Sequence, residues 1–206
     1  MKSEQLSKEK IKKLNGFSTS MTQAINPQII KSEGGGDRKR MLMLTGAAAK
    51  FSVYLFFIFS IPVLLETDYL LKIWMVEVPN YVAVFTKITI ITMLIEKFTF
   101  PIISAINATG KNKEISIAGL ITISLTIPFA YGVFEFNAPP YAIYLVGLFI
   151  SLLSAAVRLY YGKKIVGLNI RDFVVNNIFK TSLPLVLAFC VTLVPYILMG
   201  SSFIRL

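Results

Sequence analysis

The stretch Met41–Leu65, MLMLTGAAAKFSVYLFFIFSIPVLL, holds a single charged residue, Lys50. An apolar run of about 18 or more residues predicts a transmembrane helix, because the hydrocarbon core of a bilayer is about 30 Å thick and a helix rises about 1.5 Å per residue. The stretch therefore predicts that the chain folds in a lipid bilayer. Any charge inside such a crossing then requires an explanation.

The composition of the whole chain agrees with a membrane protein. Hydrophobic residues make up 55% of the 206 residues, and charged residues make up only 16%, against about 25% in soluble domains. The net charge is +10, and most lysines and arginines fall in the short segments between apolar runs. This pattern is typical of the positive-inside rule. It indicates that the basic charge faces the cytoplasm and anionic headgroups, and not nucleic acid.

Residues that commonly carry enzyme chemistry are scarce. The chain has no histidine and one cysteine, Cys190, so it lacks the commonest general base and cannot form a disulfide within itself. No nucleophile elbow, zinc-protease motif or phosphate-binding loop is present. The run Gly34-Gly35-Gly36-Asp37 lacks the Lys-Ser or Lys-Thr of a phosphate loop. We therefore expect neither an enzyme nor a bound cofactor or metal.

The hydropathy pattern predicts an all-α integral membrane protein whose residues 1–206 form a single membrane domain. We expect about six transmembrane helices, at about 5–30, 41–65, 81–108, 115–134, 141–161 and 181–200. The expected inner loops at 31–40, 107–114 and 158–180 hold four, two and five lysines plus arginines, and the outer loops hold one. This asymmetry fixes the predicted orientation from residue 31 onward. A crossing at 5–30 would place the N-terminal lysines outside, so their side stays open.

Local signals refine these helices. Residues 81–108 would measure about 42 Å as a straight helix, so tilt or a kink at Pro101 is expected. Pro128 predicts a second kink. Apolar residues of segment 169–179 share one helix face, which predicts an amphipathic helix on the cytoplasmic surface, capped by Asn169.

The order of several short motifs resembles the C-terminal half of the Wzx-like polysaccharide flippases, a branch of the MATE/MOP superfamily. The matching residues are Asn26-Pro27 with Lys31 and Gly36-Asp37, Lys50-Phe51-Ser52 with Ile61-Pro62, Leu70–Trp74 with Val78-Pro79, Ala108–Lys111, and Arg158 at a helix end. Together they extend over roughly residues 15–180.

The resemblance implies a fold and a function. Proteins of this family are built from about twelve to fourteen helices in two pseudo-symmetric halves around a central cavity. They move undecaprenyl-diphosphate-linked oligosaccharides across the bacterial inner membrane for polysaccharide or lipopolysaccharide biosynthesis. By this resemblance the chain is one half of a MATE-like two-lobe transporter. Its partner would be a missing N-terminal half or a second copy.

Charged residues within the predicted crossings are candidates for the substrate cavity. Lys50 would either attract the diphosphate or snorkel to the nearby interface. Glu96 and Lys97 lie deeper, and adjacent residues on a helix point about 100° apart. They would either form structural ion pairs or serve ion coupling and substrate contact. Gln23 and Asn26 would line the same cavity or hydrogen-bond between helices.

Three further residues are expected at the membrane interfaces. Lys87 lies near the outer end of its crossing and should snorkel. Arg158 lies near the inner end of its helix, where it would reach lipid phosphate. Trp74 is a natural anchor in the outer loop.

Other functions stay open on the sequence alone. A MATE-type exporter of cationic drugs would favour acidic cavity residues, for which Glu96 is the clear candidate. A polysaccharide polymerase or ligase is disfavoured, because such enzymes have a large outer loop and the longest one here is about fifteen residues. A fragment that does not transport on its own is the third alternative.

Overall fold

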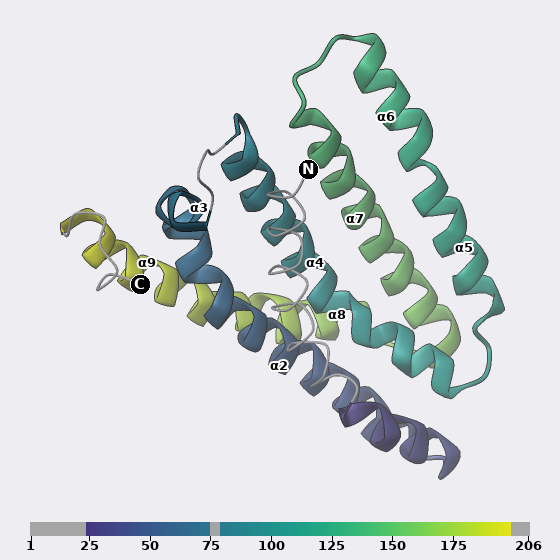
Figure 1. Cartoon of the computed structure of the whole chain (residues 1–206). Helices are drawn as coiled ribbons and strands as arrows, with labels where there is room; N and C mark the ends of the chain where they lie inside the picture. The colour runs from purple at the N-terminus through teal and green to yellow at the C-terminus, as the bar shows by residue number, and fades with distance from the viewer. Residues whose placement is uncertain (1–23, 75–78, 199–206) are drawn as a thin grey trace.

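The computed structural model describes residues 24–74 and 79–198, and these residues form helices joined by short turns, with no strand among them (Figure 1). Five helices are long and apolar enough to cross a membrane: Arg38–Leu65, Val82–Ala108, Lys113–Glu135, Ala142–Val166 and Ile170–Leu193. They correspond to five of the six expected crossings and support a multi-pass membrane protein. The sixth, at 5–30, lies largely outside the described residues, of which 24–34 are helical.

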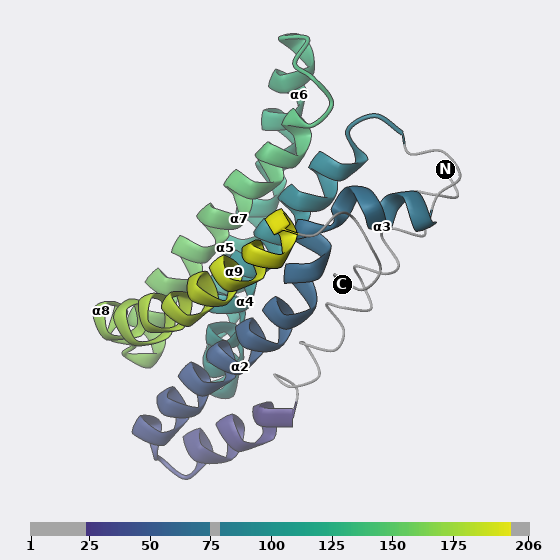
Figure 2. The same ribbon diagram turned by 90° about the vertical axis from the view of Figure 1, so that its left-hand side faces the viewer.

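The first long helix, α2 (Arg38–Leu65), follows a tight turn. Gly36 adopts a left-handed conformation with φ +77°, which glycine adopts without steric penalty. Asp37 then caps the helix by accepting a hydrogen bond from the Arg40 amide at 2.9 Å. An ion pair between Glu33 and Arg38 spans the turn, and hydrogen bonding to Arg38 lowers the pKa of Glu33. The preceding helix therefore folds back beside the start of α2 (Figure 2).

A short helix, α3 (Thr67–Trp74), separates α2 from α4 (Val82–Ala108). α4 runs as one helix through Pro101. The next crossing is divided into α5 (Lys113–Ser124) and α6 (Thr126–Glu135). Pro128 explains this division, because proline lacks an amide hydrogen and its ring clashes with the carbonyl four residues earlier, that of Ser124. The interruption thus lies one turn before the proline at which the sequence predicts a kink.

α7 (Ala142–Tyr161) packs beside α4, and both helices run in the same direction. The Ser151 hydroxyl lies 3.5 Å from the Thr92 carbonyl, and Arg158 donates to Thr99, each pair being 59 residues apart. Near the other end, the rings of Phe85 and Tyr144 stack with centroids 4.4 Å apart. All three contacts join residues whose numbers differ by 59, which shows that α4 and α7 keep one register along their length.

The chain closes with helices of mixed type. α7 continues into a π-helical turn, η1 (Gly162–Val166), which ends at Gly167. After residues 167–169, a second continuous stretch follows, made of α8 (Ile170–Phe173), a π-helical segment η2 (Val174–Phe179) and α9 (Lys180–Leu198). The predicted cap is confirmed, since Asn169 accepts a hydrogen bond from the Asp172 amide. Segment 170–179 is helical, as predicted, and is continuous with the final span. Its position at the cytoplasmic surface stays a prediction.

One face of this closing segment packs against the bundle. Phe173, Asn177, Thr181 and Leu185 are buried at a spacing of four, and α2 contacts both η2 and α9. Residues four apart lie on one face of a helix. The predicted apolar face is the one that packs, since Phe173 is buried and Ile170, Val174 and Ile178 are partly buried. The apolar pattern gave no signal for the buried Asn177.

Two glycines allow close packing between these helices. A Cβ atom at Gly46 of α2 would lie 2.9 Å from the Asn177 Oδ1, and one at Gly162 would lie 2.8 Å from the Ile102 Cγ2. Real Cβ atoms do not come so close to a neighbour, so any larger residue at either position would force the facing side chain to move. Small residues allow such close backbone approach between membrane helices.

The core has two parts along the bundle. One cluster, including Met41, Ile106, Ile115, Val166 and Phe173, lies where α2, α8 and the α4–α5 turn meet. We call this the basic end, because Arg38–Arg40, Lys111, Lys113, Lys163 and Lys164 gather there. The second cluster joins α2, α4 and α9 further along and contains Val53, Phe57, Ile61, Phe98 and Leu185.

The positive-inside pattern predicts that the basic end faces the cytoplasm. In a Cys190→Ala background, we expect a cysteine at Gly34, an open position at this end, to react with an impermeant thiol reagent only after the cells are opened. A cysteine at Phe136, which is 86% exposed in the opposite turn, should react in intact cells. The reverse labelling pattern would reject this orientation.

Candidate charged site within the membrane spans

The centre of α4 carries two adjacent charged residues, Glu96 and Lys97. They lie 14 and 15 residues after Val82, which is about 21 Å and about 23 Å along the helix axis. The opposite end, at Ala108, is about 17 Å away from Lys97. Both residues therefore lie far from the ends of a span that is long and apolar enough to cross a membrane.

Lys97 lies on the side of α4 that faces α2. Its Nζ atom is 5.9 Å from the ring centroid of Phe56, and Phe56 itself is almost completely buried between the helices. An ammonium group over an aromatic face is attracted by the electron density of the ring. This contact holds the cation within the bundle, and the residue as a whole is half-buried.

Arg158 reaches across from α7 to α4. Its Nη1 donates a hydrogen bond to the Thr99 hydroxyl at 3.2 Å, and its guanidinium carbon lies 5.8 Å from the centroid of the Phe100 ring. Thr99 is buried. Arg158 comes eight residues before Val166, where its candidate span ends, so its Cα atom lies about 12 Å along the helix from that end.

The carboxylate of Glu96 acts electrostatically on both Lys97 and Arg158. We call these three residues the midspan charge cluster. The cluster carries two positive charges and one negative charge. Charges at such a position in a membrane span are expensive unless they face the interior of the bundle and interact with one another. Lys97 and Arg158 contact neighbouring helices through Phe56 and Thr99, and Glu96 provides the opposite charge.

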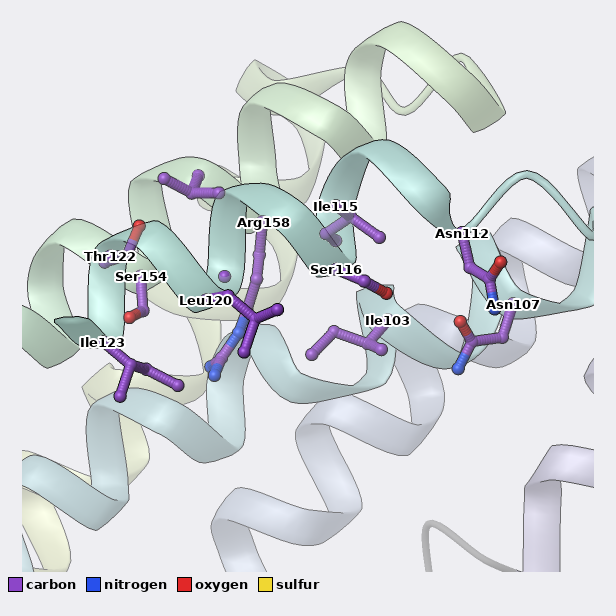
Figure 3. Close-up of a pocket in the computed structure, with 12 residues that line it drawn as sticks. Ile103, Asn107, Asn112, Ile115, Ser116, Leu120, Thr122, Ile123, Ser154 and Arg158 are labelled. Atoms are coloured by element: carbon purple, nitrogen blue, oxygen red, sulfur yellow. The ribbon is translucent and has the colours of Figure 1, made fainter.

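A pocket of about 490 Å³ opens beside this cluster, between α4, α5 and α7 (Figure 3). We call it the α5 pocket, and its walls are Ile103, Asn107, Asn112, Ile115, Ser116, Gly119, Leu120, Thr122, Ile123, Ser154, Val157 and Arg158. The sequence prediction missed it, because the pocket exists only once α5 and α4 are both placed against α7. The available signal was the spacing of Ser116, Gly119 and Thr122, three residues apart on α5.

The remaining candidates from the sequence are spread over the molecule. Lys50 is partly buried on α2. Lys87 lies 4.0 Å from the Asp68 carboxylate of α3, and both side chains are well exposed. Asn26 is partly buried, and its Oδ1 accepts no hydrogen bond from the described residues. Gln23 and the side chain of Trp74 lie outside the described part of the chain.

Charge is what distinguishes this site, and the described residues form no metal site. Within 24–74 and 79–198, no three histidine, cysteine or acidic side chains come together as metal ligands. What the geometry offers is a pair of membrane-embedded cations that can attract an anion, with one carboxylate to balance them.

Comparison with protein families, with curated proteins and with solved structures finds no match for this chain. The class that the fold and the site define is a multi-pass helical membrane protein with charged residues inside its spans.

Proposed function

We propose that this chain is one lobe of a transporter that moves undecaprenyl-diphosphate-linked oligosaccharide across the bacterial inner membrane, for polysaccharide or lipopolysaccharide biosynthesis. The observation that supports this function best is the midspan charge cluster, in which Lys97 and Arg158 outnumber Glu96. A diphosphate must cross the hydrocarbon region with its negative charges shielded. Two cations held within the bundle provide such shielding, because charge-assisted hydrogen bonds to phosphate are strong where water is scarce.

Transport by this mechanism requires a second lobe. Secondary transporters of many families bind substrate near the bilayer midplane between two structural repeats that rock against each other. The motifs that resemble the C-terminal half of Wzx-like flippases supply the second argument, and by that resemblance the partner lobe is an N-terminal half or a second copy. Energy would come from an ion gradient or the substrate gradient, and Glu96 is the residue available for ion coupling.

A MATE-type exporter of cationic compounds is the competing transport function. Glu96 favours it, because a carboxylate within the span would attract a cation. The excess of positive charge in the same cluster opposes it, since a cationic substrate would approach Lys97 and Arg158 as well. We therefore prefer the anionic substrate.

Deletion of the gene in the source bacterium tests this function. We expect surface polysaccharide to fall at least tenfold and lipid-linked oligosaccharide to accumulate in the inner membrane, with both effects reversed by the restored gene. Unchanged polysaccharide together with increased sensitivity to cationic dyes would instead identify a cation exporter. Unchanged polysaccharide and unchanged dye sensitivity would mean that the chain does not transport either class of compound.

A further inference from the structure

The α5 pocket runs from the basic end into the depth of the membrane span. Asn107 and Asn112 lie together at one end, beside the α4–α5 turn, and Thr122 and Ile123 lie at the other (Figure 3). The eleven residue steps from Asn112 to Ile123 extend over about 17 Å of helix. One end of the pocket is therefore at the membrane surface, and the other is within the hydrocarbon region.

The walls of the pocket expose more apolar than polar surface, and their one charge is positive. Five of its side chains are isoleucine, leucine or valine, and none is aspartate or glutamate. The Thr122 hydroxyl already donates to the Ala118 carbonyl. Arg158 is thus the group in this pocket that would hold an anion, with apolar surface around it for hydrocarbon.

The guanidinium of Arg158 has donors to spare. It carries five N–H groups, and the hydrogen bond to Thr99 uses one of them. Within the described residues no carboxylate lies within 4.0 Å of Arg158. Its planar group suits two parallel hydrogen bonds to a phosphate or carboxylate. Such bonds are strongest where water is largely excluded.

We propose that the α5 pocket binds a lipid with a small, bare phosphate headgroup, taken from the leaflet at the basic end. The phosphate would pass Asn107 and Asn112 and bind Arg158, while the acyl chains leave between α4 and α5. The volume of about 490 Å³ accommodates a phosphate and a few methylene groups, since pockets for small ligands measure about 300–1,000 Å³. This site is independent of the proposed transport function, because a chain that never translocates oligosaccharide would still contain it.

Binding of phosphatidic acid to the purified full chain in detergent tests this site. We expect Arg158→Gln to weaken binding at least about tenfold, because hydrogen bonds to a charged group contribute about 1.5–3 kcal/mol. Lys163→Gln removes an exposed charge at the same end of the bundle and should leave the dissociation constant within twofold. Equal binding by wild type and Arg158→Gln would overturn the proposal.

A second pair of variants keeps the charge and fills the pocket. Gly119 lines the pocket, and a Cβ atom there meets nothing within 4 Å, as at Gly132 on α6. Leucine forms helices better than glycine, so neither Gly119→Leu nor Gly132→Leu should impair folding. We expect Gly119→Leu to weaken phosphatidic acid binding at least tenfold and Gly132→Leu to bind normally. Similar binding by both variants would contradict the assignment to this pocket.

Two further ligands identify the source of the phosphate. Phosphatidylcholine with the same acyl chains should bind at least tenfold more weakly, because its headgroup is zwitterionic and larger. Inorganic phosphate at millimolar concentration should not displace phosphatidic acid. Full displacement by inorganic phosphate would show that the pocket binds a free anion and would overturn the lipid proposal. Equal binding of both lipids would show that Arg158 does not recognise the headgroup.

Discussion

A strain that carries the Lys97→Ala variant is expected to export at least about tenfold less surface polysaccharide than a strain with the unsubstituted chain. The ammonium group of Lys97 lies over the Phe56 ring at the middle of α4. In the proposed mechanism it contacts the diphosphate during passage. Loss of one charge-assisted interaction of about 1.5–3 kcal/mol raises a barrier enough to slow transport by roughly ten- to a hundredfold.

Glu96→Ala should reduce export to a similar extent for a different reason. It leaves Lys97 and Arg158 without the carboxylate that acts on both, so two positive charges would remain within the spans with no balancing charge, which is costly in a medium of low dielectric constant. The matched control is Lys87→Ala on the same helix. Lys87 forms an exposed pair with Asp68, and exposed pairs contribute about 0–1 kcal/mol, so export should stay within about threefold of normal.

Export of all three variants is measured as surface polysaccharide per cell, with the amount of membrane-inserted protein determined in parallel. This correction separates a transport defect from a loss of protein. Near-normal export by Lys97→Ala and Glu96→Ala at equal protein levels would remove the midspan charge cluster from the mechanism. An equal reduction in Lys87→Ala would have the same meaning, because depth in the membrane would then not matter.

Gly46→Leu should cause the largest loss of stability. The position leaves no room for a side chain, since even a Cβ atom would lie 2.9 Å from the Asn177 Oδ1. Both residues are buried where α2 packs against η2. Overpacking of a tight interface typically destabilises by about 1–3 kcal/mol, and a leucine adds three further carbon atoms beyond that clash. We therefore expect a several-fold lower yield of monodisperse protein.

The yield after detergent extraction, and the temperature at which half of the protein aggregates, measure this effect. Gly132→Leu provides the control, because its Cβ atom would meet open space. The smaller change Gly46→Ala should be partly rescued by Asn177→Ala, since removal of the amide relieves the contact. Equal yields for Gly46→Leu and Gly132→Leu, or no coupling in the double variant, would show that α2 does not pack closely on η2.

The membrane spans could be read from the sequence because apolar length alone defines them. Met41–Leu65 became part of α2, and the expected crossing at 81–108 became α4, which starts at Val82. The helix cap at Asn169 could also be predicted from neighbouring residues, and its side chain caps α8. These features depend on residues close together in the chain.

Features that depend on packing between distant segments could not be read in the same way. Arg158 was expected near the inner end of its helix and at lipid phosphate, whereas its contact with Thr99 depends on the register of α7 against α4, 59 residues earlier in the chain. The α5 pocket requires three helices to be placed together. Segment 170–179 was expected to be a helix with one apolar face, and that face is the buried one, but its contact with α2 could not be read from the sequence.

The most direct test of the proposed function is translocation in vesicles that contain only this chain or this chain with a candidate partner lobe. A fluorescent undecaprenyl-diphosphate-linked oligosaccharide is placed in both leaflets, and the fraction that an external glycosidase can cleave is followed over time. We predict that cleavage proceeds beyond the outer-leaflet pool in the presence of the protein, and that Lys97→Ala slows it at least about tenfold. Cleavage that stops at the outer-leaflet pool, as in protein-free vesicles, under both conditions would contradict the proposal that this chain moves lipid-linked oligosaccharide.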